Sequence, residues 1–376
     1  MYNRIIEKSI KEHMFRGKII ILYGPRQAGK TTLVKKILNE FKDEKKYIQC
    51  DIPSQRASIS KAEPEEMKKF FGNAKLIVID EAQLVLNIGT ILKTFIDTYQ
   101  DVQVIATGSS SFDLANKIKE PLTGRAFEYL LYPLSYEEIK DTKDLFYFKS
   151  HEEYIMRYGW YPGIMDLPEI ETKDALELLQ TNNLYKDIYT LENIKKPAVL
   201  EGIINFLAFN IGSSLTTNGI AKEIQTSAKT VERYIDLLEK MFVIVKLHGF
   251  ARNLHNEIRK GFKIYFIDIG LRNSIINNHN PLNKRNDIGG LFENFFVIER
   301  IKFLQNHKIK TNSYFWKTYN DIEVDYVEEK DGLLSAFECK YSDNKSKSLY
   351  LFKNAYPDSI IQVVNKDNYL NFLENR

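Results

Sequence analysis

Cysteine is scarce in this sequence: only Cys50 and Cys339 occur among 376 residues, and both fall within predicted apolar strands. Two thiols cannot form the disulfide framework of a small secreted protein, so we expect buried, reduced cysteines in the cytoplasm. No apolar run approaches the roughly 18 residues that a membrane-spanning helix requires. The first residues, Met1–Lys8, also lack the pattern of a signal peptide. These absences predict a cytoplasmic protein without a membrane partner.

An excess of charge of one sign is also missing. Lysine and arginine number 53 against 50 acidic residues, which leaves a formal net charge of +3. This balance is too mild to indicate nucleic-acid binding by itself, so such binding must rest on local patches. Hydrophobic residues make up 44% of the chain and aromatic residues 12%, which excludes wholesale disorder. The length exceeds one ordinary core and predicts about two to four domains.

The most informative feature present is a glycine-rich stretch between a short apolar strand and a helix. The strand is expected at 18–23 and the helix at 31–41, with Gly-x-x-x-x-Gly-Lys-Thr between them. In this context the motif is typical of a phosphate-binding loop, whose backbone N–H groups and following helix face the phosphates. Lys30 is expected to reach the β- and γ-phosphates, and the Thr31 hydroxyl to bind Mg²⁺. The predicted ATP-binding residues are Gly24, Pro25, Arg26, Gln27, Ala28, Gly29, Lys30, Thr31 and Thr32.

Two carboxylates, Asp80 and Glu81, end the next apolar run, Leu76–Ile79. In a parallel sheet that is buried on both faces, ligands bind at the carboxyl ends of the strands. Asp80 is therefore expected to hold Mg²⁺ through water, and Glu81 to polarise the attacking water as a general base. The alternative interpretation is a strand capped by two solvated acids. The neighbouring phosphate-loop motif favours the catalytic interpretation.

Strands and helices alternate through the first part of the chain, which predicts a parallel sheet. Further strands are expected at 46–50, 75–80, 102–106 and 126–131. Arg125 follows the fourth strand of this sheet and directly precedes the last. We interpret it as an arginine finger for the nucleotide of a neighbouring subunit, with a solvated loop arginine as the alternative.

A winged helix-turn-helix is predicted after residue 200. A short helix, a turn at 225–227 and a longer helix precede an apolar strand. Spacings of three and four predict one buried face on the longer helix, made of Val231, Tyr234, Ile235, Leu238 and Met241. Lys229, Thr230 and Arg233 would then face outward, where such a helix enters the DNA major groove. Winged helices also serve as protein-packing modules, and this alternative stays open.

The last hundred residues contain a second set of chemically active side chains, Glu293, Asp325, Glu338 and Lys340. The expected elements are a helix at 289–304, strands at 311–316, 322–328 and 333–340, a helix at 346–355 and a strand at 360–364. Residues two apart on a strand share a face, so Glu338 and Lys340 point to the same side. Three carboxylates can bind one or two Mg²⁺ ions that activate water, with Lys340 orienting the nucleophile. Ordinary surface alternation on two strands is the alternative.

These motifs resemble two known families. Asp325 followed by Glu338-Cys-Lys340, with a helical Glu293 upstream, resembles the restriction-endonuclease-like nucleases. Almost the whole chain is similar to AAA+-type P-loop ATPases of archaea and bacteria. That resemblance rests on Gly-Pro-Arg-Gln-Ala-Gly-Lys-Thr-Thr, Ile-Asp-Glu-Ala-Gln, Ala-Thr-Gly-Ser-Ser, Leu-Thr-Gly-Arg, Tyr-Pro-Leu-Ser-Tyr-Glu-Glu, Phe-Ile-Asp-Ile-Gly-Leu and Glu-Val-Asp-Tyr-Val. It departs from the family at Gly159-Trp160-Tyr161-Pro162, where two glycines usually precede Tyr-Pro.

The second resemblance implies ATP hydrolysis with Mg²⁺, DNA as a partner and a homo-oligomer, for which a hexamer is one candidate. It also implies that Thr107 lies beside the γ-phosphate, and a Ser/Thr helix cap before Phe112 is the open alternative for this segment. The expected fold class is α/β, with a P-loop parallel sheet, a helical lid, a winged helix and a restriction-endonuclease-like domain. A nucleotide-dependent switch that binds protein partners without cleavage, and a structure-specific nuclease, are the rival functions. The expected segments are 1–140 (ATPase core), 141–200 (lid), 201–250 (winged helix), 251–284 (connector) and 285–376 (nuclease-like domain).

Overall fold

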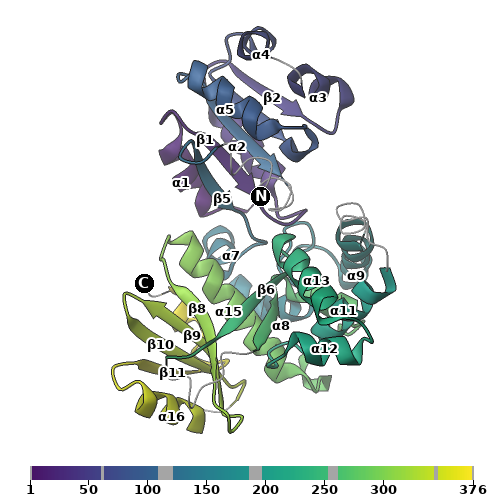
Figure 1. The fold of residues 1–376 in the computed structure, drawn as a ribbon, viewed down its shortest axis with the longest axis vertical. Helices are drawn as coiled ribbons and strands as arrows, with labels where there is room; N and C mark the ends of the chain where they lie inside the picture. Colours follow the sequence, from purple (N-terminus) through teal and green to yellow (C-terminus); the bar gives the residue numbers. More distant parts are fainter. Residues whose placement is uncertain are drawn as a thin grey trace. The chain divides into compact units, whose positions relative to one another are not determined.

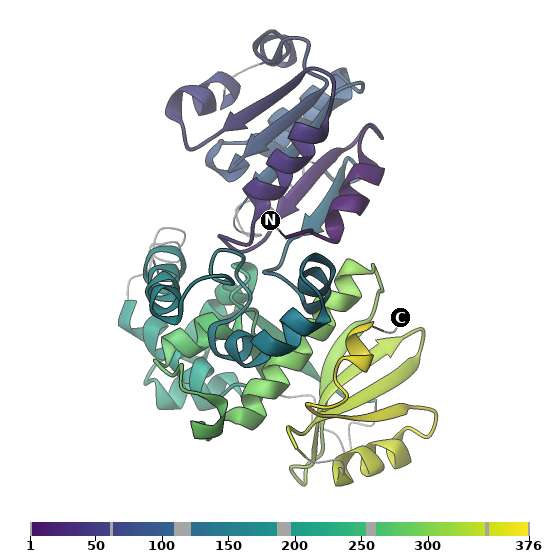
Figure 2. The ribbon, with the colours of Figure 1, turned by 180° about the vertical axis from the view of Figure 1, so that it is seen from behind.

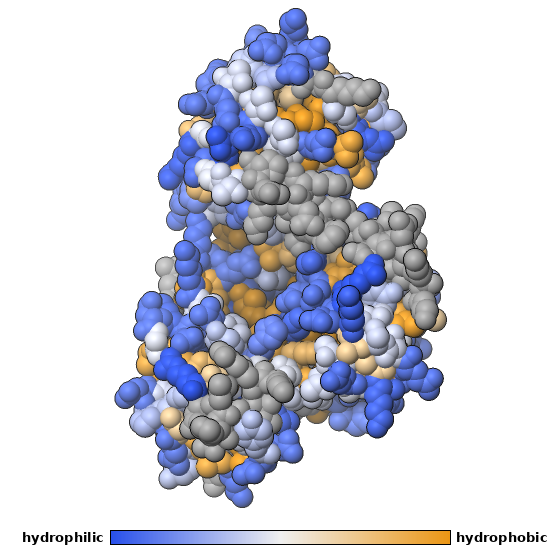
Figure 3. Space-filling model, viewed as in Figure 1, coloured by the Kyte–Doolittle hydropathy of each residue, from blue (hydrophilic) through white to orange (hydrophobic). Residues whose placement is uncertain are grey.

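The computed structural model describes residues 2–60, 63–108, 122–185, 197–252, 261–342 and 346–374. The chain divides into two compact units. The N-terminal unit comprises Met1–Leu134 with Lys240–Phe242, and the C-terminal unit comprises Ser135–Glu239 with Val243–Arg376. In this described part of the chain, no helix is long and apolar enough to cross a membrane. On the face drawn in Figure 3, hydrophilic residues predominate, and hydrophobic residues show in patches between them.

The N-terminal unit contains a five-stranded parallel sheet in the order β2-β3-β4-β1-β5. Its strands are β1 (Ile19–Tyr23), β2 (Lys45–Gln49), β3 (Leu76–Asp80), β4 (Gln103–Gly108) and β5 (Ala126–Leu130). Each strand overlaps the range expected from the sequence. The predicted parallel α/β sheet is therefore confirmed.

Both faces of this sheet are buried, which explains why its strands are continuously apolar. Ile19 and Ile21 pack on one face with α3, α4 and α5, whereas Ile20 and Leu22 pack on the other face with α1 and α2. Figure 1 shows α5 in front of the sheet, and Figure 2, seen from behind, shows the purple helices α1 and α2 in front. The helices are α1 (Ile6–His13), α2 (Lys30–Glu40), α3 (Pro53–Ser60), α4 (Pro64–Phe71) and α5 (Ile88–Thr98).

The C-terminal unit contains a six-stranded mixed sheet in the order β11-β10-β9-β8-β6-β7. Its strands are β6 (Ile244–Phe250), β7 (Phe262–Phe266), β8 (Asn312–Lys317), β9 (Glu323–Lys330), β10 (Leu333–Cys339) and β11 (Ile360–Val364). The antiparallel β6–β7 hairpin joins β8 through a parallel pairing of β6. The segments expected as a winged helix and as a nuclease-like domain thus share one sheet. The expected connector contains β7 and α14.

The helices expected on either side of the turn at 225–227, and those expected at 289–304 and 346–355, correspond to α12, α13, α15 and α16. On α13, Val231, Tyr234, Ile235 and Leu238 are buried, and the Ser227 hydroxyl accepts from the backbone N–H of Thr230 at 3.1 Å. In the sheet region, α15 packs on β7 and β10, and α16 packs on β9, β10 and β11. The elements are α7 (Tyr136–Thr142), α8 (Leu145–Tyr158), α9 (Glu169–Leu178), a π-helix (Leu179–Tyr185), α11 (Pro197–Phe209), α12 (Thr217–Glu223), α13 (Ala228–Lys240), α14 (Ile269–Ile275), α15 (Ile288–Asn306), α16 (Lys347–Ala355) and α17 (Asn371–Glu374).

Candidate functional site

The glycine-rich loop lies at the carboxyl end of β1 and leads into α2, which begins at Lys30. Gly24 (φ 148°), Gln27 (φ 60°) and Gly29 (φ 97°) have positive φ angles, which curl the backbone into a tight loop. Lys30 is 5% exposed, and its ammonium donates to the carbonyl oxygens of Gly24 and Pro25, at 2.8 Å from each. An anion at the N-terminus of α2 would compete with these carbonyls for the ammonium.

Gly24 lies directly against the backbone that follows β5. A β-carbon at this position would lie 2.1 Å from the carbonyl oxygen of Leu131. We therefore expect Gly24→Ala to lower the free energy of unfolding by about 3 kcal/mol, through the clash and the positive φ. Gly124→Ala is the control, because Gly124 also has a positive φ (76°) but has nothing within 4 Å of the β-carbon position. Gly124→Ala should lower the free energy of unfolding, measured by urea denaturation, by only about 1 kcal/mol. Equal losses of stability in the two variants would show that the contact with Leu131 is not the cause.

Asp80, the last residue of β3, is 3% exposed and forms hydrogen bonds to α2, β2 and β4. Its Oδ2 accepts from the Thr31 hydroxyl at 2.8 Å and from the Tyr47 hydroxyl at 2.5 Å, and its Oδ1 accepts from the Thr107 hydroxyl. Burial and the Asp80 carboxylate raise the pKa of Tyr47, so this phenol keeps its proton at neutral pH. Mg²⁺ is usually bound through one or two carboxylates, together with substrate phosphates. Thr31 and Asp80 therefore fit the ion that the motif predicts.

Glu81 follows β3 in a left-handed conformation (φ 54°, ψ 44°), which is uncommon for a residue other than glycine. Its backbone N–H donates to the Thr107 hydroxyl at 3.2 Å, and its carboxylate accepts from the Gln83 amide. Thr107 thus joins Asp80 to Glu81. Sequence reasoning missed Gln83, although its place two residues after Glu81 in Ile-Asp-Glu-Ala-Gln was the available signal.

Arg4 is a second residue that the sequence did not reveal. It is buried, and its guanidinium donates to the carbonyl oxygens of Ala28 at 2.6 Å and Tyr132 at 2.5 Å. It therefore fastens the phosphate-binding loop to the segment that follows β5. A single arginine before an amphipathic helix carries no local pattern that predicts this role.

Arg125 lies at the amino ends of the strands, whereas the glycine-rich loop of the same chain lies at their carboxyl ends. It directly precedes β5, and its carbonyl oxygen accepts from the backbone N–H of Ile19, the first residue of β1. Its side chain is partly exposed and forms an ion pair with Asp97 at 2.7 Å. Because the whole length of β1 separates these two ends, Arg125 lies away from the glycine-rich loop of its own chain. A role toward a neighbouring subunit stays a prediction.

In the C-terminal unit, three elements meet at the buried ammonium of Lys263 on β7. This group lies 3.0 Å from Glu293 Oε1 on α15 and 2.9 Å from Asp325 Oδ1 on β9. Glu323 Oε2 lies 3.6 Å away. Burial alone would lower the pKa of Lys263, but these three carboxylates raise it above its usual value, so the ammonium stays charged. Sequence reasoning missed Lys263. The available signal was its charge, because it is a lysine within the apolar run Phe262–Phe266.

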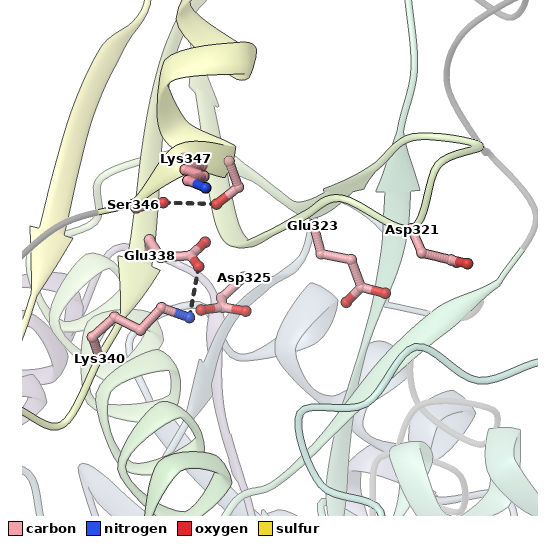
Figure 4. Close-up of a pocket in the computed structure, with 8 residues that line it drawn as sticks. Asp321, Glu323, Asp325, Glu338, Lys340, Ser346 and Lys347 are labelled. Atoms are coloured by element: carbon pink, nitrogen blue, oxygen red, sulfur yellow. Dashed lines mark hydrogen bonds and ion pairs between the residues drawn. The ribbon is translucent and has the colours of Figure 1, made fainter. Parts of the chain in front are cut away.

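Glu338 and Lys340 pair with each other beside Asp325 (Figure 4). The Lys340 ammonium lies 2.9 Å from Glu338 Oε1. Glu338 is 5% exposed, and its Oε2 has no hydrogen-bond partner among the described residues. Burial, and then the charge of Asp325, raise the pKa of Glu338. A cavity of about 470 Å³ opens here, lined by Asp321, Glu323, Asp325, Glu338, Lys340, Ser346, Lys347 and Ser348.

The acids of the expected metal centre are paired with lysines in this structure. Among the residues that the structure describes, no group of three or more histidine, cysteine, aspartate or glutamate side chains could hold a metal ion. The Lys263 ammonium lies between Glu293 and Asp325, and Lys340 pairs with Glu338. Joint binding of Mg²⁺ by Glu293, Asp325 and Glu338 stays a prediction.

The residues expected to face DNA lie at the start of α13. Lys229 and Arg233 are exposed, and Thr230 is partly buried. The Thr230 hydroxyl lies 2.8 Å from the Ser227 hydroxyl, so it takes part in capping the helix. Lys229 and Arg233 are therefore exposed as predicted, whereas Thr230 contributes to the N-terminal cap of α13.

Three family models match separate segments of the chain, and two uncharacterized proteins resemble nearly all of it. Residues 16–140 match the family model of an AAA domain (AAA_14), and residues 149–282 and 288–373 match two domains of unknown function (DUF8612 and DUF4143). The uncharacterized protein Rv2008c of Mycobacterium tuberculosis is 24% identical over 342 residues, which cover 90% of this chain and 74% of that protein. MJ1544 of Methanocaldococcus jannaschii, also uncharacterized, is 25% identical over 389 residues, which cover 96% and 84%.

A solved structure has a similar fold over most of the chain. The Walker-type ATPase PABY2304 of Pyrococcus abyssi has a TM-score of 0.53 at 16% identity and covers 73% of this chain and 96% of its own. The family model thus indicates an AAA domain within residues 16–140, and the likeness to PABY2304 shows a shared fold. The nucleotide-site residues described above lie within the matched range 16–140.

Proposed function

We propose that this protein hydrolyses ATP at the carboxyl ends of β1, β3 and β4 and couples the nucleotide cycle to DNA binding. One observation carries the proposal. Thr31, Asp80, Thr107 and Glu81 form a continuous chain of hydrogen bonds beside the loop that contains Lys30. Hydrolysis needs a phosphate cradle, a magnesium ligand and a base, and these residues supply each of them within one site.

Each residue has a distinct part in this proposal. The loop N–H groups and Lys30 bind the phosphates, and Glu81 accepts a proton from the attacking water. Thr31 and Asp80 would hold Mg²⁺, which, when bound, neutralises charge that develops on the phosphoryl oxygens. Gln83 orients the Glu81 carboxylate, and Thr107 fixes the Glu81 backbone. Arg125 would complete the site of a neighbouring subunit in a homo-oligomer.

DNA binding is proposed for α12, α13 and the β6–β7 hairpin. Leu215, between α11 and α12, forms an isolated antiparallel bridge with Phe262 of this hairpin, an arrangement that supports a winged helix. Lys229 and Arg233 are exposed on α13 and would contact DNA phosphates or base edges. The proposal does not include DNA cleavage. Lys263 and Lys340 neutralise the charges of Asp325 and Glu338, the acids that cleavage would need for metal binding.

The direct test measures phosphate release by the purified chain with ATP and Mg²⁺, with and without duplex, forked and four-way DNA. We expect turnover without DNA and a higher rate with DNA. Absence of hydrolysis with every nucleoside triphosphate would overturn the assignment of the site. Turnover that no DNA changes, with DNA affinity insensitive to salt, would favour the switch that binds protein partners instead.

Replacing both Lys229 and Arg233 with alanine is expected to weaken DNA binding about tenfold or more and to reduce its salt slope by about two, one for each lost phosphate contact. Fluorescence anisotropy at several salt concentrations measures both quantities. Lys310→Ala is the control, because this exposed lysine follows α15 and lies outside the proposed contact face. An unchanged salt slope in the double variant would show that this face of α13 does not contact DNA.

A further inference from the structure

The space between Glu293 and Asp325 is already filled by a cation of the protein itself. Lys263 is 1% exposed and donates to Glu293 Oε1 and Asp325 Oδ1. The same acids have other donors: the Tyr265 hydroxyl reaches Glu293 Oε1 at 2.6 Å, and the Cys339 backbone N–H reaches Asp325 Oδ2 at 2.9 Å. Donors on β7 and β10 thus satisfy both carboxylates, and the Lys263 ammonium on β7 balances their charge.

A divalent ion would need the same oxygens. Such an ion binds carboxylate oxygens at about 2.0–2.6 Å and would lie in the position that the ammonium occupies. Two cations cannot share one buried position, because their repulsion in a low-dielectric interior is large.

We propose that Lys263 replaces a metal ion in this cluster, so the C-terminal unit is held together by a built-in cation and does not bind a divalent metal between Glu293 and Asp325. The ammonium joins β7 to α15 and β9, and it thereby fixes the β6–β7 hairpin to the rest of the sheet. This inference is independent of ATP hydrolysis and of DNA binding. It implies that removing the ammonium creates a site for a divalent ion.

The test uses the full chain without nucleotide and follows thermal unfolding in EDTA and in 1 mM Mn²⁺. The melting temperature of the wild type should shift by less than about 1 °C between the two. Lys263→Met should lower the melting temperature in EDTA by roughly 5–10 °C, because two buried carboxylates lose their counterion. Mn²⁺ should restore at least half of that loss, and calorimetry should show one bound Mn²⁺ per chain in the variant.

Lys302→Met is the matched control. Lys302 is equally buried and pairs with Glu299 at 2.8 Å, so its loss should also destabilise the unit, but without rescue by Mn²⁺. If Lys263→Met does not fold, the double variant Lys263→Met/Glu293→Gln removes one charge of each sign and should fold. The proposal is overturned if Mn²⁺ stabilises the wild type by several degrees and Asp325→Asn abolishes that effect. Equal responses of the two methionine variants to Mn²⁺ would overturn it as well.

Discussion

Replacing Glu81 with glutamine is expected to lower the rate of ATP hydrolysis about a thousandfold, the range found for loss of a general base. Glutamine has the same shape but cannot accept the proton of the attacking water. Its amide can keep a hydrogen bond to Gln83, and the backbone N–H still reaches the Thr107 hydroxyl. The affinity for ATP should therefore stay within about threefold, because the loop and Lys30 are untouched.

Steady-state phosphate release and equilibrium binding of a fluorescent ATP analogue measure the two effects separately. Glu65→Gln is the matched control, since Glu65 is an exposed carboxylate on α4 of the same unit. It should change neither quantity. A Glu81→Gln variant with undiminished turnover would show that the base is another group, and one that loses nucleotide affinity would show that Glu81 acts in binding.

Local sequence was sufficient for most secondary structure. The run Ile19–Tyr23 has no charged residue because both faces of its sheet are covered. Such a run can be predicted as a strand from its own residues, without knowledge of the strands beside it. The phosphate-binding loop is equally local, since Gly24 and Gly29 adopt positive φ angles within one short stretch. The same holds for the order of strands and helices after residue 288.

Contacts between distant segments were not predictable in this way. The parallel pairing of β6 with β8 places the hairpin in the C-terminal sheet, although more than one helix separates the two strands in sequence. Lys263 is visible as a charge in an apolar strand and must have an acidic partner. Which acids it meets depends on the twist of the sheet and on the position of α15, and neither follows from local spacing. The ion pairs of Lys263 with Glu293 and Asp325 could not be foreseen for this reason, and Mg²⁺ binding by Glu293, Asp325 and Glu338 stays a prediction.

Lys30→Ala should weaken ATP binding at least about 100-fold, a loss of about 2.7 kcal/mol that matches the strength of a charge-assisted hydrogen bond in a buried site. In the present structure the ammonium is bound to the carbonyl oxygens of Gly24 and Pro25, so it is already positioned in the loop. At 100 times the wild-type Kd, ATP should stabilise the wild type by about 2.7 kcal/mol and the variant by about 0.4 kcal/mol.

Thermal unfolding with and without Mg²⁺-ATP measures this difference, and phosphate release should disappear in the same variant. Lys36→Ala is the control on the same helix: its ion pair with Glu7, at 2.9 Å, is partly exposed. Losing that pair costs at most about 1 kcal/mol, and it costs the same amount in the presence and absence of nucleotide. Because Lys36 lies outside the loop, ATP should stabilise its variant as much as the wild type. Equal ATP stabilisation of the Lys30 variant would mean that the triphosphate binds elsewhere, and the assignment of the loop would then be wrong.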